Sequence, residues 1–393
     1  MANDIFPMHE YRMHHQRPFR TAAFALGFFL LGTSPTVAKT LSVGPGEQFK
    51  QPSEAITAAA DGDTIEVAPG EYLDCAIISR NHLTIVGTGP GVIVTDKTCA
   101  GKALFVTDGD DITFRNLTLT RARVIDGNGA GIRAEGGDLT VENVQFIDNQ
   151  TGLLAGDQSR SKIRILDSVF KQNGRCETSC IASLSVGHIA LLHVERSKII
   201  ETRRAHQISS GALRTELIKD DIEDGRWGSS SYLVDIPNGG ALVIQESTFQ
   251  KGLLSSNLGA AVMIGDVDRS QPTDLAIAHN RFVNDTGIDT IFIKNWSEAE
   301  ASLDRNTFKG DDVVPTSADG YFKHWIHHTV AAIESGIFEF SLRLRGVMQT
   351  IKIPRFYSNS PALVAQFARR HSRSSVASPF GRQGERRQLI RQF

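Results

Sequence analysis

The chain has 393 residues, with 42 Lys and Arg against 44 Asp and Glu, a formal net charge of -2 and a hydrophobic fraction of 40%. These values are typical of a folded globular protein and exclude collagen, coiled-coil and fully disordered chains. The near-neutral balance also gives no sign of the strongly basic domain that marks a nucleic-acid-binding protein.

An apolar segment near the N-terminus has the layout of a secretory signal peptide. Residues Thr21–Gly32 are apolar or small, follow Arg12, Arg17 and Arg20, and precede the small-residue pattern Thr36-Val37-Ala38. Crossing a membrane takes about 20 apolar residues, so this run is too short to serve as an anchor. We expect a cleaved signal at residues 1–38, no transmembrane anchor after cleavage, and a secreted or periplasmic protein.

Four cysteines in an exported chain favour disulfide bonds. Cys75 and Cys99 are 24 residues apart, close to one period of the repeat described below, so they can lie on neighbouring coils. Cys176 and Cys180 can close a small loop. No His lies at a zinc-ligand spacing from either pair, which makes a metal site the weaker interpretation.

A repeat of short strands fixes the predicted architecture. Apolar residues at one position and at +2 are followed by a turn residue near +4 or +5 and by Phe, Ile or Leu at +7, eight times at a mean interval of 27 residues, less cleanly in the repeat that starts at Thr215. The repeats start at Ile112, Leu139, Ile163, Leu192, Thr215, Leu242, Leu275 and Ala301. Each repeat reads as strand, turn, strand and a Gly/Asn/Asp loop, which cannot bury its apolar face unless it stacks on its neighbours. The prediction is an all-β parallel β-helix with coils about 4.8 Å apart.

The +5 position of the repeat becomes polar along the chain and predicts a ladder of stacked side chains. It changes from Leu117 and Val144 to Ser168, Ser197, Asp220, Ser247, Asn280 and Asn306. Inward polar side chains are unfavourable unless they are paired, and residues one strand apart can pair.

The two ends of the solenoid have distinct sequences. Residues 53–60 read as a short helix with Ser53 as N-cap, which would cover the apolar N-terminal end of the coils. After Phe308 the repeat is lost, and residues 316–393 form a basic C-terminal tail that we expect to be partly disordered or partly a cap. The predicted β-helix domain therefore covers residues 40–315.

The segments GPGEQF (44–49) and ADGDTIEVAPGEY (60–72), followed by the coils, resemble right-handed parallel β-helix proteins of the pectate-lyase-like superfamily. The resemblance implies a right-handed coil and is weak for activity, because the superfamily includes lyases, hydrolases, esterases and adhesins. Segments 205–212 and 229–240 are similar to a group of bacterial exported β-helix proteins. In that group a Lys and an Arg follow the His at the positions of Ser209 and Gly211, so this chain would lack two candidate bases.

Loop residues at the same offset in successive coils stack on one side of a β-helix and could form a binding or catalytic site. Arg203 and Arg226 share one offset, His206 and Asp289 share another, and Trp227 and Tyr232 lie in the same set of loops. Arg can pair with a uronate carboxylate, and Trp offers an apolar face to a sugar ring. For a lyase, we predict His206 and Arg226 as catalytic base and neutraliser, and Arg203, Trp227, Tyr232 and Asp289 as substrate-binding residues. The same residues also fit solvated loop charges and a packing anchor.

The sequence also contains candidate residues for two further enzyme classes. Hydrolysis requires paired carboxylates, for which the candidates are Asp220/Asp221, Glu223/Asp224 and Asp285/Asp289. A Ca²⁺-dependent lyase requires converging carboxylates, for which the candidates are Asp108, Asp110 and Asp111, or Asp266 and Asp268. Because Gly109 and Gly265 mark turns beside these acids, local hydrogen bonding explains them better. No organic cofactor is expected.

The sequence thus leaves three hypotheses for an exported β-helix protein. It binds or acts on an acidic polysaccharide in a lyase-like manner, it is an envelope protein that binds glycan without catalysis, or it is an adhesive solenoid with no enzymatic activity. The glycan, the reaction and the oligomeric state stay open at this level.

Overall fold

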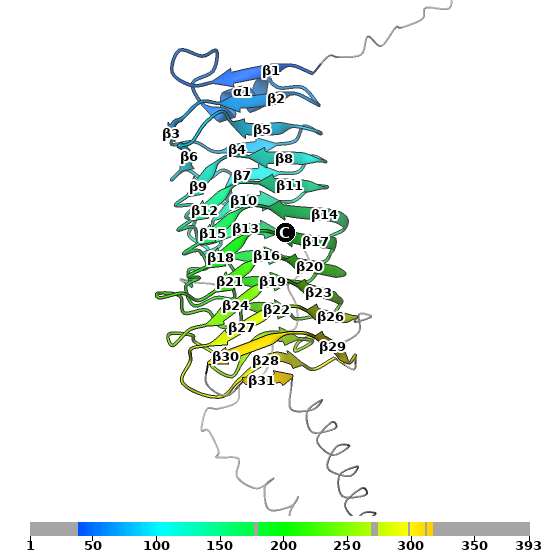
Figure 1. Cartoon of the computed structure of the whole chain (residues 1–393). Helices are drawn as coiled ribbons and strands as arrows, with labels where there is room; N and C mark the ends of the chain where they lie inside the picture. The colour runs from blue at the N-terminus through cyan, green and yellow to red at the C-terminus, as the bar shows by residue number, and fades with distance from the viewer. Residues whose placement is uncertain (1–37, 177–179, 269–273, 298, 311–312, 317–393) are drawn as a thin grey trace, which may run out of the picture. The chain divides into compact units, whose positions relative to one another are not determined.

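The computed structural model describes residues 38–176, 180–268, 274–297, 299–310 and 313–316. The predicted signal peptide and all but the first residue of the predicted basic tail lie outside these residues. Between Thr40 and Thr316 the chain forms 31 short strands and one short helix. The strands build three parallel sheets that run side by side along the stack of coils (Figure 1).

The first sheet, sheet A, contains the first strand of each predicted repeat. Its strands are β1 (Thr40–Val43), β2 (Thr64–Val67), β5 (Thr84–Gly87), β8 (Ile112–Arg115), β11 (Leu139–Glu142), β14 (Gln158–Leu166), β17 (Ile189–Glu195), β20 (Arg214–Ile218), β23 (Ala241–Gln245), β26 (Leu275–Ala278) and β29 (Ala301–Asp304). All eight predicted repeat starts are register partners of one another in adjacent strands, from Ile112 to Ala301. The periodicity therefore predicts the register as well as the architecture.

The second sheet, sheet B, contains the second strand of each repeat. Its strands are β3 (Gly70–Tyr72), β6 (Val92–Thr95), β9 (Thr118–Thr120), β12 (Gln145–Ile147), β15 (Val169–Lys171), β18 (Lys198–Ile200), β21 (Asp221–Glu223), β24 (Thr248–Lys251), β27 (Arg281–Asn284) and β30 (Thr307–Gly310). Inward aromatic rings stack between coils here, as Phe146 and Phe170 do at 4.4 Å between ring centroids.

The third sheet, sheet C, lies in the stretches that the sequence analysis treated as loops. Its strands are β4 (Ala76–Ile78), β7 (Ala103–Thr107), β10 (Ala130–Ala134), β13 (Thr151–Ala155), β16 (Leu184–Val186), β19 (Ile208–Ser210), β22 (Val234–Ile236), β25 (Ala260–Ile264), β28 (Thr290–Asn295) and β31 (Val313–Thr316). Several of these strands, such as β7, β13 and β25, are buried at every residue. Such strands lack the polar–apolar alternation by which half-buried strands are recognised.

The predicted polar ladder is present between sheets A and B. The side-chain oxygen of each member accepts the backbone N–H of the member one coil earlier, as in Ser197 N–H to Asp220 Oδ1 (2.8 Å) and Ser247 N–H to Asn280 Oδ1 (2.9 Å). The ladder therefore satisfies mainly backbone donors of the turns. The side-chain pairing that the sequence suggested is present between Asn280 and Asn306, where Nδ2–H of Asn280 donates to Oδ1 of Asn306 (3.0 Å).

A second ladder, absent from the sequence prediction, lies in the turns that connect sheets B and C, here called the B–C turns. Asn149 Oδ1 accepts the backbone N–H of Ala122 (2.9 Å), and Asn173 Oδ1 accepts that of Asn149 (3.0 Å). Both asparagines are fully buried, so their amides replace water for backbone groups inside the turns.

The N-terminal helix α1 (Pro52–Ala58) packs against β1, β2 and β4 and buries Ala55 and Ile56. The prediction of Ser53 as N-cap is wrong, because Gln51 occupies the N-cap position and Pro52 is the first helical residue. Ser53 instead donates its backbone N–H and its hydroxyl to Asp74 (2.7 and 2.9 Å), which ties the helix to the next coil.

Both predicted disulfides are present. Cys75 and Cys99 join neighbouring coils with Cα atoms 5.5 Å apart, and Cys176 and Cys180 close a small loop before β16. No cysteine among the described residues is free.

Candidate functional site

A carboxyl group on the outer face of sheet C is the centre of the candidate site. In β22 the side chains of Val234 and Ile236 are in the core, so that of Asp235 between them points outward. Asp235 is nevertheless only 7% exposed. It lies between Ser209 of β19 and Met263 of β25, its register partners in the adjacent coils.

Asp235 is buried with only partial compensation of its charge. Ser209 Oγ donates a hydrogen bond to Oδ2 (3.3 Å), and His206 Nε2 lies 3.9 Å from the same oxygen. Oδ1 is buried and has no hydrogen-bond partner among the described residues. Burial raises the pKa of Asp235 to about 7, the nearby Asp266 carboxylate adds to the rise, and Ser209 opposes it. Near neutral pH this carboxyl can therefore either accept or release a proton.

His206 faces Asp235 as a neutral imidazole. The backbone N–H of Tyr232 donates to His206 Nδ1 (3.1 Å), which assigns the proton of the neutral ring to Nε2, the nitrogen that faces Asp235. The His206 ring also stacks on the Tyr232 ring, with centroids 5.3 Å apart and planes inclined by 8°. Burial lowers the pKa of His206 to about 4, and the positive charge of Lys251 adds to this decrease while Asp266 opposes it.

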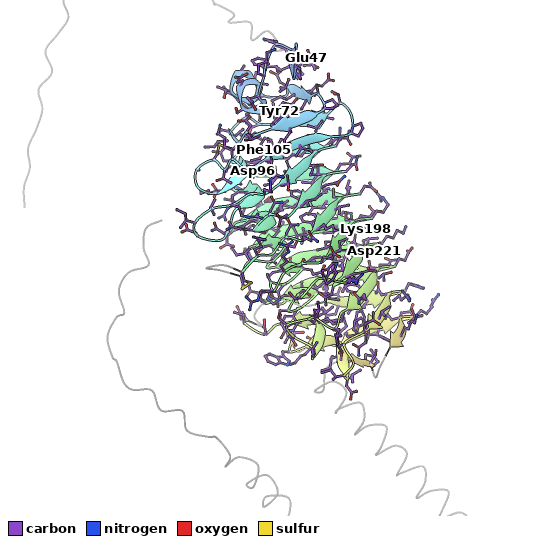
Figure 2. The ribbon with its side chains drawn as sticks, turned by 90° about the vertical axis from the view of Figure 1, so that its left-hand side faces the viewer. Glu47, Tyr72, Asp96, Phe105, Lys198 and Asp221 are labelled. Carbon is purple, nitrogen blue, oxygen red and sulfur yellow. A yellow bond between two sulfur atoms is a disulfide. The ribbon has the colours of Figure 1, made fainter. Side chains whose placement is uncertain are left out.

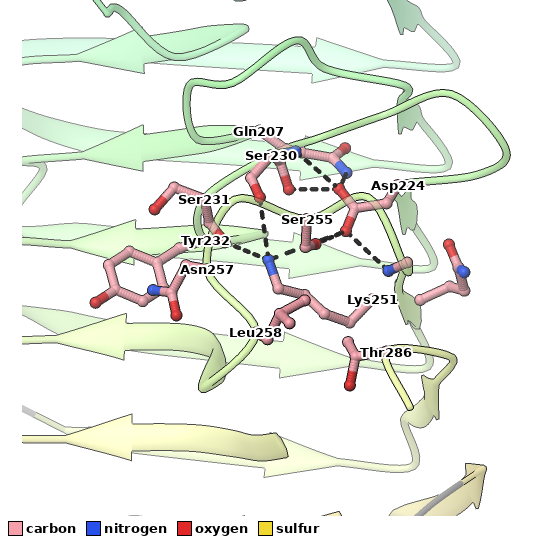
Figure 3. A network of polar contacts seen from close by, with 12 residues as sticks. Gln207, Asp224, Ser230, Ser231, Tyr232, Lys251, Ser255, Asn257, Leu258 and Thr286 are labelled. Carbon is pink, nitrogen blue, oxygen red and sulfur yellow. Dashed lines mark hydrogen bonds and ion pairs between the residues drawn. The ribbon is translucent and has the colours of Figure 1, made fainter. Parts of the chain in front are cut away.

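Tyr232 completes this group of side chains. Burial raises the pKa of its phenol, and a hydrogen bond with Asn257 opposes the rise. Figure 3 shows the Tyr232 ring beside the Asn257 amide. The phenol is therefore a hydrogen-bond donor at neutral pH. Together, Asp235, His206, Tyr232 and Ser209 form what we call the Asp235 site.

Three arginines surround one carboxylate in the preceding B–C turns. The Asp148 carboxylate lies 3.0 Å from Arg123, 3.2 Å from Arg203 and 3.6 Å from Arg175. Arg203 also donates to Gln172 Oε1 (3.4 Å). Arg203 and His206 are three residues apart in the same turn, so their Cα atoms lie within about 11 Å of each other.

The remaining predicted residues lie further out on the B–C turns. The Arg226 guanidinium lies over the exposed ring of Trp227, 4.7 Å from its centroid. Asp289 is exposed in the turn before β28. The structure therefore brings His206 together with Tyr232, and Arg226 together with Trp227. Among the described residues, no hydrogen bond, ion pair or ring contact joins these two pairs.

Most of the paired carboxylates considered for hydrolysis do not face a common space. Asp220 is buried in the ladder, whereas Asp221 lies on the outer face of sheet B, 3.0 Å from Lys198 (Figure 2). Asp224 is fully buried, whereas the Glu223 side chain next to it is only half-buried. Asp285 accepts a hydrogen bond from Gln250 (2.9 Å).

Asp110 and Asp111, two of the five candidate Ca²⁺-binding acids, have local partners. Asp110 Oδ1 accepts the backbone N–H of Asp138 (2.9 Å), and Asp111 lies 3.0 Å from His82 Nδ1. Asp108, Asp266 and Asp268 are on the surface. In the part of the chain that the structure describes, no three His, Cys, Asp or Glu side chains are grouped so that they could hold a metal ion.

Close packing between adjacent coils explains the glycine at position 211. Its backbone N–H donates to Val186 O (2.9 Å), and a Cβ at this position would lie 3.1 Å from the carbonyl group of Gly187 one coil earlier. A larger residue would push these two coils apart. Neither Ser209 nor Gly211 supplies a cation beside Asp235.

Sequence reasoning missed Asp235, although it lies within the segment 229–240 that carried the resemblance. The available signal was an acid between two apolar residues, Val234 and Ile236, which is the pattern of an outward-facing strand position. That pattern is common in solvated strands. The burial that distinguishes Asp235 arises from neighbouring coils and loops.

A surface cavity of about 410 Å³ lies elsewhere, beside the turns after β5 and β8. Its lining includes Asn116, Asn143 and Gln145 but no charged side chain, so it offers little for acid–base chemistry. No helix among the described residues is long and apolar enough to cross a bilayer.

Comparison with known proteins supports no assignment beyond the architecture. No protein-family model and no curated protein matches the chain. Among solved structures, an alginate lyase from Paenibacillus sp. str. FPU-7 is 15% identical, with 71% of this chain and 99% of that chain covered and a TM-score of 0.45. The pectin methylesterase PemA from Erwinia chrysanthemi is 13% identical over 72% and 94% of the two chains, with a TM-score of 0.39. The pectin methylesterase from Yersinia enterocolitica is 12% identical over 69% and 95%, with a TM-score of 0.37.

Proposed function

We propose that this is an exported β-helix protein that binds an acidic polysaccharide along its B–C turns and acts on it by proton transfer at the Asp235 site. The observation that carries the proposal is Asp235 itself. It is a nearly buried carboxyl on an outer sheet face, with one oxygen lacking a partner and a pKa of about 7. Strongly perturbed titratable groups are typical of functional sites. Export is supported by the N-terminal signal pattern and by two disulfides.

The chemistry that suits this arrangement is β-elimination from a uronate. That reaction needs a base for the proton next to the carboxylate and hydrogen-bond donors or cations that stabilise the charge developing on it. Ionised Asp235 is the better proton acceptor, because His206 Nδ1 is occupied by the Tyr232 N–H. The C5 proton would pass to Asp235, the C4=C5 double bond would form as the C4–O4 bond breaks, and the departing glycosidic oxygen would take a proton from the Tyr232 phenol. His206 Nε2–H would donate to the uronate carboxylate. The arginine cluster and the Arg226–Trp227 pair would hold other sugar units of the same chain.

The test is incubation of the mature protein, with and without Ca²⁺, against a panel of uronate-containing polysaccharides. The readouts are the ultraviolet absorbance of the unsaturated product and the release of reducing ends. We expect activity that increases as the pH rises through about 7, the pKa of Asp235, and that falls at least about 100-fold in Asp235→Asn protein. Asp221→Asn, which removes an outer carboxylate of sheet B, is the matched control and should leave the rate unchanged. Equal rates for wild-type and Asp235→Asn protein would contradict the role of Asp235.

A non-catalytic glycan-binding protein of the envelope is the second candidate. The observation that favours it is that, within the described part of the chain, Asp235 is contacted by the neutral hydroxyl of Ser209 and not by a cation. In this case the panel gives no product, but one glycan retards the protein in an affinity gel. Arg203→Ala would then reduce the retardation and Asp235→Asn would leave it unchanged. If the panel gives neither product nor retardation, the adhesive solenoid without a glycan site is favoured.

A further inference from the structure

A fully buried ion pair lies inside the coils behind the Asp235 site. Lys251, at the end of β24, and Asp224, one coil earlier, are both 0% exposed, and Lys251 Nζ lies 3.9 Å from Asp224 Oδ2. Asp224 also accepts hydrogen bonds from Gly252 N–H (2.9 Å) and from the hydroxyls of Ser230 and Ser255 (Figure 3). Both oxygens of Asp224 therefore accept hydrogen bonds from groups other than Lys251.

The remaining hydrogen bonds of Lys251 go to the turn that carries Tyr232. Its ammonium group donates to the carbonyl oxygens of Ser230 (3.4 Å) and Ser231. The Ser231 carbonyl belongs to the same planar peptide group as the Tyr232 N–H. That N–H donates to His206 Nδ1 (3.1 Å). A single peptide group thus lies between a buried cation and the imidazole of the Asp235 site.

We propose that Lys251 is a positioning residue, which acts through the Ser231–Tyr232 peptide group to hold His206 with Nδ1 as acceptor and Nε2–H facing Asp235. The positive charge polarises the peptide and strengthens its N–H as a donor, because hydrogen bonds in a chain reinforce each other where the local dielectric is low. An effect of Lys251 on catalysis rests on the proposed function. The geometry of His206 itself can be tested without any substrate.

Burial of the pair is difficult to explain by stability alone. Replacing a buried ion pair with apolar residues of similar volume is often neutral or stabilising. Burial lowers the pKa of Lys251 to about 8, and only Asp224 opposes the decrease. The charged groups that act on His206 are Asp235, Asp266 and Lys251. Lys251 is the only cation among these three, and its charge lowers the pKa of His206, so removing it should raise that pKa.

The experiment is nitrogen NMR of His206 in the mature protein without glycan, as a function of pH. Wild-type protein should show the proton on Nε2 and a titration near pH 4. Removing both buried charges in Asp224→Asn/Lys251→Met protein avoids leaving one charge unpaired. In this variant we expect the pKa of His206 to rise, because the positive charge of Lys251 no longer lowers it, and both tautomers to be populated. Ser255→Ala, which removes one donor to Asp224 but leaves Lys251 in place, is the control. It should change neither the pKa nor the tautomer of His206.

Two results would overturn the proposal. One is a folded double variant in which the tautomer and the titration of His206 are unchanged. The other, which requires no variant to fold, is wild-type protein with the proton on Nδ1. Neither depends on catalysis, so an inactive glycan panel would contradict the proposed function and leave the positioning role of Lys251 intact. If both hold, the double variant should also show a lower rate and a displaced pH profile.

Discussion

At the scale of single residues, the molecule contains carboxyl groups whose protonation is set by burial. Asp220 and Asp235 both have raised pKa values, of about 8 and about 7, and in both the first cause is desolvation. Asp235 lies on the outer face of sheet C and is 7% exposed. Asp220 lies in the ladder between sheets A and B, where Oδ1 accepts the Ser197 N–H and Oδ2 is buried with no hydrogen-bond partner in the described part of the chain. The same physical effect thus serves a candidate reaction in one place and imposes a stability cost in the other.

We predict that Asp220→Asn stabilises the protein at alkaline pH. The folded-state pKa of Asp220 is raised, so between pH about 4 and about 8 the unfolded chain loses this proton while the native state retains it, and stability falls as the pH rises. Asparagine keeps the accepting oxygen and carries no charge, as Asn280 does in the same ladder. Thermal unfolding should show a midpoint about 4 °C or more higher at pH 8 and a smaller difference at pH 4. Asp221→Asn should show no such pH-dependent gain, and a midpoint lowered at pH 8 by Asp220→Asn would refute the argument.

At the scale of elements, the turns depend on ladders that satisfy backbone donors between coils. Asn173 Oδ1 accepts from the backbone and the amide of Asn149, and its own amide donates to the Phe146 carbonyl (2.9 Å). The short strands of sheets B and C contribute few backbone hydrogen bonds each. The B–C turns, which also carry the arginine cluster and His206, therefore rely on this buried asparagine pair for their shape.

We predict that Asn173→Ala destabilises the protein by about 2–4 kcal/mol, because it leaves a buried N–H and a buried carbonyl without partners. Urea unfolding monitored by fluorescence and circular dichroism would measure the loss. Thr140→Ala, on the outward side of β11, is the control and should change stability by well under half of that amount. An Asn173→Ala protein as stable as the control would mean that water replaces the amide in this turn.

At the scale of the whole molecule, the described coils end with inward-facing side chains that lack a following coil. Phe308 continues the inward column that includes Phe249 and Phe282, yet it is 39% exposed whereas those two are 0% exposed. A solenoid needs a polar cap at each end. At the N-terminal end, α1 packs on β1, β2 and β4. At the other end, the basic segment 317–393 follows the last described strand, β31, in the sequence.

We predict that residues 317–393 protect the C-terminal coil. Protein truncated after Thr316 should unfold at a lower temperature and self-associate through the exposed end, as shown by sedimentation. Phe308→Ser in the truncated protein should reduce the association, because it removes the exposed ring. If full-length and truncated protein have the same unfolding midpoint and the same sedimentation behaviour, the tail has no capping role.

The sequence by itself determined the stacked coils, their register from Ile112 to Ala301, the ladder from Ser168 to Asn306 and both disulfides. The coils, their register and the ladder recur at intervals of 23 to 33 residues, so each is visible within a few residues and is supported by its copies in neighbouring coils. Each disulfide was suggested by the spacing of its two cysteines. The third strands were missed, because several of them, such as β7, β13 and β25, are buried on both faces and have no alternation to recognise. The Asp235 site and Lys251 escaped for a different reason. Desolvation, tautomer and pairing depend on which atoms meet across three coils and on how much water they exclude, and only the tertiary structure decides that.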